Sequence, residues 1–213
     1  DRYGRRPILL ASVFGTFLGF LLLGFADGIG TALANAFNPQ AANFFVLGIL
    51  FLSRMVDGLT GGNLSVAQAY IADVTDEKDR SKGLGMVGAA FGIGFIIGPA
   101  TGGVLSQWGY AVPGFVAAAL SFINLLLIYF WLPESLTDEK RANMPETKPA
   151  VTLAALVQAL TRPFTGALLT ARFFYGLAFA VFQTIFALYA LQKFNFQARD
   201  TGFILTYVGV LSV

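Results

Sequence analysis

The stretch GLGMVGAAFGIGFIIGPATGG, residues 83–103, is the most informative part of the sequence. It is apolar and as long as a membrane-spanning helix, which takes about 20 residues. Gly94, Gly98 and Gly102 recur every four residues, so they would form a groove without side chains along one helix face. Pro99 removes one backbone hydrogen bond and is expected to bend the helix within this groove. Taken alone, the glycine spacing is also typical of ordinary helix packing in membranes.

The composition places the whole chain in a membrane. The 213 residues are 56% hydrophobic and 12% charged, with a mean hydropathy of +0.68. Soluble domains carry about 25% charged residues, so a soluble globular domain is excluded. The absence of Cys and His excludes disulfides, thiolate zinc sites, Ser-His-Asp triads and imidazole relays. A formal net charge of +2 is too small to indicate nucleic acid binding.

Five long apolar runs and the start of a sixth divide the chain. They cover residues 8–26, 44–72, 83–105, 112–132, 164–191 and 201–213. Polar segments are expected between them, at 27–43, 73–82 and 134–163, with a short amphipathic helix over 153–160. The chain has neither an initiator Met nor a signal-peptide pattern, so we expect it to be part of a longer protein.

Basic residues are distributed unevenly over the polar segments. Lys193 and Arg199 lie on one side of the predicted membrane, and the other side carries Arg2, Arg5, Arg6, Lys78, Arg80, Lys82, Lys140, Arg141, Lys148 and Arg162. Because basic loops stay in the cytoplasm, we expect the chain start and the loop 134–163 to be cytoplasmic.

Two charged residues lie well inside the second predicted span. Arg54 and Asp57 are three residues apart and share a helix face, which Gly61, Ser65 and Gln68 would continue. A charge inside a membrane costs about 2.5–3.5 kcal/mol, so such residues usually face a bundle interior or an aqueous cavity. The pair fits two interpretations: a structural ion pair that fixes helix register, or a group that takes part in transport.

The chain begins with DRYGRR, in which Gly4 permits a tight turn and the arginines also fit an ordinary cytoplasmic loop. Together with the two features above, this start resembles the major facilitator superfamily, and within it the drug/proton antiporters that include tetracycline-resistance pumps. Asp1, Arg2, Gly4, Arg5 and Arg6 match the family's loop between helices two and three. The family's antiporter motif is matched by Gly85, Gly94, Gly98, Pro99, Gly102 and Gly103.

The resemblance implies an all-α polytopic helix bundle, of which this chain holds about helices three to eight of twelve. Residues 1–133 would belong to the N-terminal six-helix half, 134–163 to the central cytoplasmic loop, and 164–213 to the start of the C-terminal half. It also implies that the loop at the chain start latches the cytoplasmic side, with Asp73 as the partner of Arg5. A solvated carboxylate at Asp73 and a lipid phosphate beside Arg5 are the alternatives.

Further roles follow from the same resemblance. Arg54 resembles the family's helix-four arginine, which is associated with proton transfer; the family pattern defines Asp57 less closely. The Gly-rich helix would pack against helix eight and prevent leak, with Gly202 and Gly209 as its complement. A stripe in the fifth span and one isolated amide are candidates for a substrate cavity, namely Arg172, Tyr175, Phe179, Gln183 and Asn124. Lipid contact by the aromatic residues and snorkelling of Arg172 are the alternatives.

The expected function is secondary active transport by alternating access, with efflux of drug-like organic solutes in exchange for protons. The proton gradient would supply the energy, and no metal or other cofactor is expected. The partners would be the solute, protons and the lipid bilayer of a bacterial inner membrane, with a full-length monomer. The alternative is a transporter of a sugar or another metabolite without certain proton coupling. An enzyme is disfavoured because Asp57 stands alone among the carboxylates within the spans, which is too few for a catalytic dyad.

Overall fold

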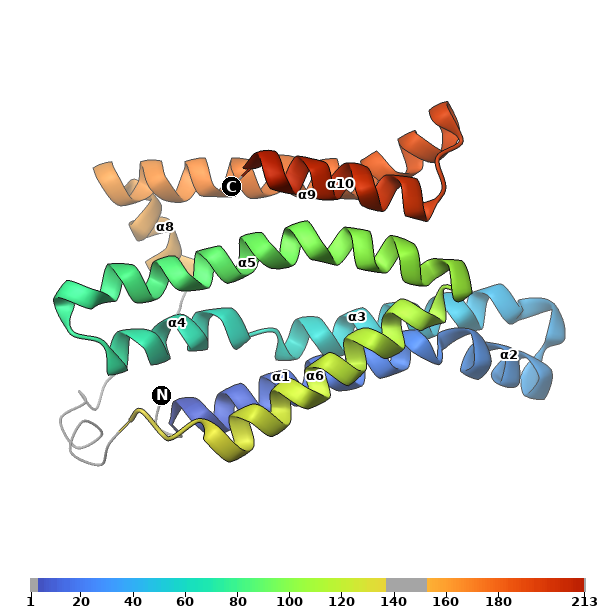
Figure 1. The fold of residues 1–213 in the computed structure, drawn as a ribbon, viewed down its shortest axis with the longest axis horizontal. Coiled ribbons are helices and arrows are strands. Elements are labelled where there is room, and N and C mark those ends of the chain that lie inside the picture. The colour runs from blue at the N-terminus through green and yellow to red at the C-terminus, as the bar shows by residue number, and fades with distance from the viewer. Residues whose placement is uncertain (1–3, 137–152, 213) are drawn as a thin grey trace. The chain divides into compact units, whose positions relative to one another are not determined.

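A computed structural model describes residues 4–136 and 153–212, and every regular element in these ranges is a helix (Figure 1). The described residues fall into two compact units. The smaller unit consists of α8 (Leu153–Thr161) and α9 (Pro163–Phe194). The larger unit contains α1 (Arg5–Gly24), α2 (Ala26–Phe37), α3 (Ala42–Thr60), α4 (Asn63–Val74), α5 (Glu77–Leu105), α6 (Ala111–Trp131) and α10 (Ala198–Ser212).

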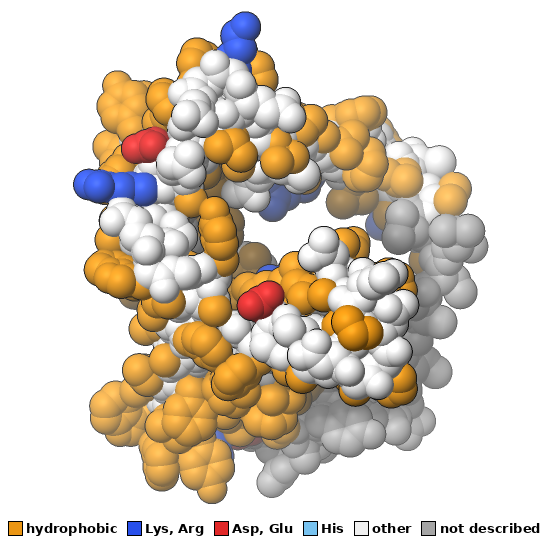
Figure 2. Space-filling view, turned by 90° about the vertical axis from the view of Figure 1, so that its right-hand side faces the viewer, with side chains coloured by type: hydrophobic (Ala, Val, Ile, Leu, Met, Phe, Trp, Pro, Cys, Tyr) orange, Lys and Arg blue, Asp and Glu red, His pale blue; other side chains and the backbone are white. Residues whose placement is uncertain are grey.

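Five segments are long and apolar enough to cross a membrane. They are Arg5–Gly24, Pro39–Val74, Glu77–Trp108, Ala111–Trp131 and Pro163–Phe194, which confirms the five predicted spans. Many large apolar side chains point outward, among them Phe130 and Trp131 with 72% and 80% exposure. Such exposed apolar side chains are typical of helices that face lipid or further helices. Figure 2, viewed from the right-hand side of Figure 1, shows few charged side chains at that end.

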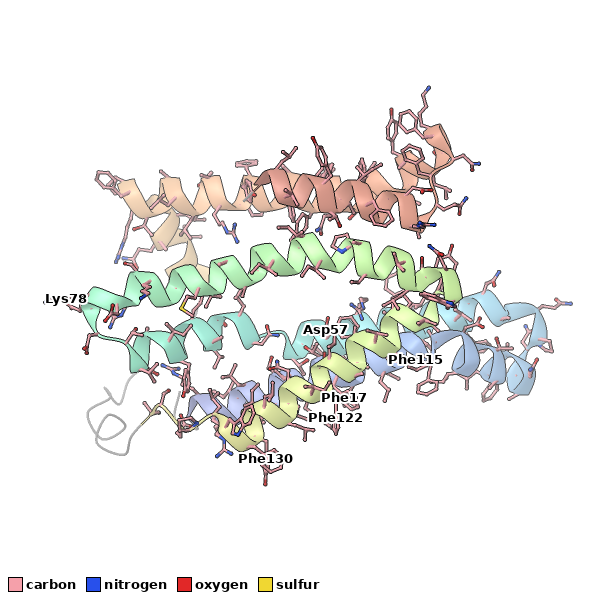
Figure 3. All side chains as sticks on the ribbon, viewed as in Figure 1. Phe17, Asp57, Lys78, Phe115, Phe122 and Phe130 are labelled. Atoms are coloured by element: carbon pink, nitrogen blue, oxygen red, sulfur yellow. The ribbon has the colours of Figure 1, made fainter. Side chains whose placement is uncertain are left out.

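Helix α1 is the centre of the larger unit. It packs against α6, α3 and α4, and its Leu9 and Val13 form a buried cluster with Ile128 of α6. Phe17 and Phe122 continue this contact with ring centroids 5.4 Å apart (Figure 3). The apolar contacts between α1 and α6 thus hold together segments more than a hundred residues apart in sequence.

The connecting segment predicted over 27–43 contains a helix that the sequence analysis did not predict. Helix α2 follows α1 after a single residue, Phe25, and the amide of Ile29 donates to the carbonyl of Phe25 at 2.9 Å. Ala26, Gly30 and Ala34 are buried at every fourth position. A Cβ atom at Gly30 would lie 2.6 Å from the Cα of Val46, so this small-residue face allows α2 to approach α3 closely.

The second predicted span is interrupted near its middle. Helix α3 ends at Thr60, α4 begins at Asn63, and Gly61 and Gly62 form the break between them. The amide of Gly62 donates to the carbonyl of Thr60 at 2.7 Å, which is not an α-helical pattern. The single helix face predicted from Arg54 through to Gln68 is therefore wrong.

Helix α10 packs on the Gly-rich helix α5, as predicted for Gly202 and Gly209. A Cβ atom at Gly202 would overlap the carbonyl oxygen of Pro99, and one at Gly209 would lie 3.2 Å from side-chain atoms of Phe95 and Ile96. The hydroxyl of Thr206 also donates to the carbonyl of Ile96 at 2.8 Å. The two helices are thus joined at the turn that contains the proline.

This contact does not lie over the predicted groove. The α5 glycine facing α10 is Gly103, where a Cβ atom would lie 2.7 Å from the carbonyl oxygen of Ala198. In the described structure no atom outside the helix's own neighbouring backbone lies within 4 Å of a Cβ built at Gly85, Gly94, Gly98 or Gly102. The small residues of α5 therefore present two faces, one packed by α10 and one open among the described residues.

Gly202→Ala is expected to destabilise the protein by about 1–3 kcal/mol, because the added methyl group forces α10 away from Pro99. The measurement is the thermal unfolding midpoint of the full-length protein in detergent. Gly48→Ala is the control, since a Cβ atom at Gly48 meets nothing within 4 Å. Equal midpoints for the two variants would contradict the close approach of α10 to α5.

Candidate functional site

The start of α1 and the ends of α4 and α6 meet at one end of the larger unit, at the left of Figure 1. We call the residues that join them the α1–α4–α6 junction; they are Gly4, Arg5, Arg6, Asp73, Glu134 and Ser135. The predicted pair is present here, with Arg5 Nε 3.0 Å from Asp73 Oδ2 and the side chains only 12% and 23% exposed. Partial burial makes this pair stronger than an ordinary surface ion pair. Asp1 and Arg2 lie outside the described residues.

Glu134 lies just beyond the span that ends at Trp131, and its carboxylate faces the first turn of α1. The backbone amides of Arg5 and Arg6 donate to its two oxygens at 2.8 and 3.2 Å. Burial alone would raise the pKa of Glu134, but the hydrogen bonds from the amides of Arg5, Leu136, Arg6 and Ser135 lower it below the ordinary value. The carboxylate therefore binds in its ionised form to the positive end of a helix.

The intramembrane charges predicted from the sequence also lie together. Arg54 Nη1 is 3.6 Å from Asp57 Oδ2, and Asp57 lies near the middle of the segment Pro39–Val74 (Figure 3). The guanidinium stacks 5.2 Å from the centre of the Phe20 ring of α1, and Nε contacts the hydroxyl of the fully buried Ser53 at 3.3 Å. Arg54 is thus held by an anion, an aromatic ring and a hydroxyl from two helices.

Close packing of α1 brings these groups together. A Cβ atom at Gly19 would lie 3.1 Å from both the Cβ of Asp57 and the carbonyl oxygen of Ser53. Two turns earlier on α1, the hydroxyl of Ser12 donates to the carbonyl of Thr60, which ends α3. The carbonyl of Gly62, on the other side of the break, accepts from the amide of Val66 at 3.1 Å and from the hydroxyl of Ser65 at 3.0 Å. A side chain of α1 thus binds the carbonyl with which α3 ends.

A cavity of about 750 Å³ lies between α1, α4, α5 and α6. Its walls are mostly apolar, and Asn124 of α6, which the sequence singled out, lines it. Asn63 and Tyr70 of α4 add further polar groups that the sequence analysis missed. The signal for Asn63 was its position directly after the two glycines of the break. Such a combination of apolar walls and few polar groups is typical of sites for organic ligands.

The four candidate residues of α9 form a stripe within the smaller unit. The rings of Tyr175 and Phe179 are stacked with centroids 6.3 Å apart, and the guanidinium of Arg172 lies 5.9 Å from the Tyr175 ring centre. Gln183 lies one turn further along the same helix. Tyr175 is 63% exposed, so this stripe is open to a ligand, to lipid or to another helix.

Among the described residues no group of three or more His, Cys, Asp or Glu side chains is placed to hold a metal ion. The candidate site consists of the two charged pairs and the helix ends and break beside them. A family model described as the Major Facilitator Superfamily matches residues 1–213. The chain belongs to the Major Facilitator Superfamily. This is a family of membrane transporters and not of enzymes, and the chain is a partial, multi-pass member of it.

Curated relatives of this superfamily member include drug-resistance proteins of bacteria. The chain is 33% identical to the tetracycline resistance protein, class C, of Escherichia coli over 211 residues, and 32% identical to the class B protein of the same species. It is 29% identical to multidrug resistance protein 2 of Bacillus subtilis (strain 168) over 218 residues. These alignments cover 99–100% of this chain but only 48–49% of each relative. No solved structure matches the chain significantly.

The lowered pKa of Glu134 predicts a pH-dependent contribution to stability. The ionised carboxylate stabilises the fold above the ordinary glutamate pKa of about 4.3, and this stabilisation is lost as the pH falls through the lower folded pKa. Glu134→Gln should therefore lower the thermal midpoint at pH 7, and the difference from wild type should shrink toward pH 3. Parallel midpoint curves over this range would contradict the assignment.

Proposed function

We propose that the whole protein exports drug-like organic solutes in exchange for protons, by alternating access. The observation that carries this proposal is the Arg54–Asp57 pair in the middle of a span, packed against α1. A bilayer makes such charges expensive, and intramembrane ionisable residues commonly mark proton or substrate pathways. With no His in the chain, Asp57 is the carboxylate best placed to take up and release a proton.

Small organic solutes are the proposed substrates. Support comes from the relatives named for tetracycline and multidrug resistance, and from the apolar cavity with Asn124 and the aromatic stripe on α9. In this proposal the stripe and Asn124 contact the solute. The proposed location is a bacterial inner membrane, and the protein acts as a monomer whose chain start and loop 134–163 face the cytoplasm.

We assign the remaining motif residues to gating. The cytoplasmic latch opens and closes during the cycle. It consists of Asp1, Arg2, Gly4, Arg5 and Arg6, with Asp73 as their partner. The antiporter motif on α5, including Gly94, Gly98 and Gly102, keeps the centre closed to leak. The contact of α10 at Pro99 and Gly103 supports this role, because it joins a helix of the proposed C-terminal half (164–213) to one of the N-terminal half (1–133), on either side of the loop 134–163.

Arg54→Ala should reduce proton-driven tetracycline uptake into inverted membrane vesicles about tenfold or more, since an uncompensated charge at Asp57 costs about 2.5–3.5 kcal/mol in a membrane. Gly98→Leu should reduce uptake as well, by placing a side chain in the open groove of α5. Lys78→Ala, at the exposed end of the bundle (Figure 3), serves as the control and should transport like wild type.

Unchanged uptake in both Arg54→Ala and Gly98→Leu would overturn these assignments. Wild-type transport that persists after the proton gradient is collapsed would favour the alternative, a facilitator of a sugar or another metabolite.

A further inference from the structure

The loop that follows α6 makes contacts that none of the motifs above accounts for. Pro133, Glu134 and Ser135 follow shortly after the span that ends at Trp131. Each makes a different contact: Pro133 with Tyr70 of α4, Glu134 with the first turn of α1, and Ser135 with Asp73. The geometry points to Glu134 and Ser135 as positioning residues for the Arg5–Asp73 pair. This inference rests on the proposed function, in which that pair is the cytoplasmic latch.

Glu134 caps the N-terminus of α1. Gly4 precedes the helix and has no side chain, so the amides of the first turn need an acceptor from elsewhere. Glu134 supplies it from 129 residues away, with one oxygen on the amide of Arg5 and the other on the amide of Arg6. The carboxylate therefore fixes the backbone from which the Arg5 guanidinium reaches Asp73.

The contact with Glu134 requires a glycine at position 4. Its backbone φ is +88°, a conformation that residues with a side chain rarely adopt. A Cβ atom there would also lie 2.7 Å from the carboxyl carbon of Glu134. A glycine is needed for both reasons, because any larger residue would push the carboxylate off the helix end. The cap thus depends on both residues, on Glu134 as the acceptor and on Gly4 because it leaves room for the carboxylate.

The same loop also contacts Asp73, through Ser135. The hydroxyl of Ser135 lies 3.3 Å from Asp73 Oδ2, the oxygen that also accepts from Arg5 Nε. The path from the Arg5 amide through Glu134, Ser135 and Asp73 to the Arg5 guanidinium is therefore a closed ring. Tyr70 of α4 donates to the carbonyl of Pro133 at 3.1 Å, and the Arg6 guanidinium donates to the carbonyl of Tyr129 in α6. These contacts join three helices around the latch.

The ring has a functional consequence. When the pair separates during a transport cycle, Arg5 stays anchored through its backbone and Asp73 keeps the Ser135 hydroxyl, so both partners remain in place to meet again. Without Glu134, the start of α1 loses two charge-assisted hydrogen bonds. The backbone of Arg5, from which the guanidinium reaches Asp73, is then no longer held in place. Glu134 therefore acts through the Arg5–Asp73 pair and not on the solute.

A double-mutant cycle on the full-length protein tests this assignment. Glu134→Gln should lower the initial rate of tetracycline uptake into inverted vesicles about fivefold, the equivalent of losing one helix cap. In an Asp73→Asn background the same change should lower the rate less than twofold, because the pair that Glu134 positions is already lost. Ser135→Ala should likewise be nearly silent in that background. Glu77→Gln, an exposed glutamate at the start of α5, is the matched control and should leave the rate unchanged in both backgrounds.

The thermal unfolding midpoints of the wild type, Glu134→Gln, Asp73→Asn and the double variant in detergent give a second cycle that needs no substrate. Equal effects of Glu134→Gln with and without Asp73→Asn, in either the rates or the midpoints, would overturn the positioning role. Wild-type vesicles that move no tetracycline would instead overturn the proposed function, and the midpoint cycle would still decide the role of Glu134.

Discussion

A helix in a bilayer satisfies its own backbone hydrogen bonds everywhere except at its ends and breaks, and this constraint governs the structure. At three such places in the larger unit, the start of α1, the break after α3 and the proline turn of α5, a side chain from another helix or its loop makes a hydrogen bond. Glu134 accepts from the first amides of α1, Ser12 of α1 donates to the last carbonyl of α3, and Thr206 of α10 donates beside Pro99 in α5. Polar contacts between helices thus occur at each of these three places.

The candidate functional groups lie at the same places. The Arg5–Asp73 pair adjoins the cap of α1, and the Arg54–Asp57 pair lies in the last two turns of α3, before the break at Gly61 and Gly62. The contact of α10 lies at the proline of α5. Interrupted helices are points at which a bundle can change its shape without breaking many hydrogen bonds. Both charged pairs and the α10 contact thus lie beside a helix end, a break or a proline.

Much of this could be predicted from the sequence, because hydropathy and i,i+3 spacing are local signals. The five spans and the Arg54–Asp57 pair follow from such signals, and the Arg5–Asp73 pair followed from the family resemblance. The helix over Ala26–Phe37 was missed because its buried face consists of Ala and Gly, which carry little hydropathy. Glu134 was missed as a cap because its partners are 128 and 129 residues away, and no local pattern reports such a contact. The face of α5 that α10 contacts depends on helix rotation, which glycine spacing does not determine.

The most direct test of the account is the exchange of protons for drug by the full-length protein. Proteoliposomes with an acidic interior and an internal pH dye would receive tetracycline on the outside. Exchange of protons for drug predicts that the drug accumulates inside and that the interior becomes alkaline faster in its presence, with both effects lost in Asp57→Asn. Drug uptake without any drug-dependent movement of protons would contradict it.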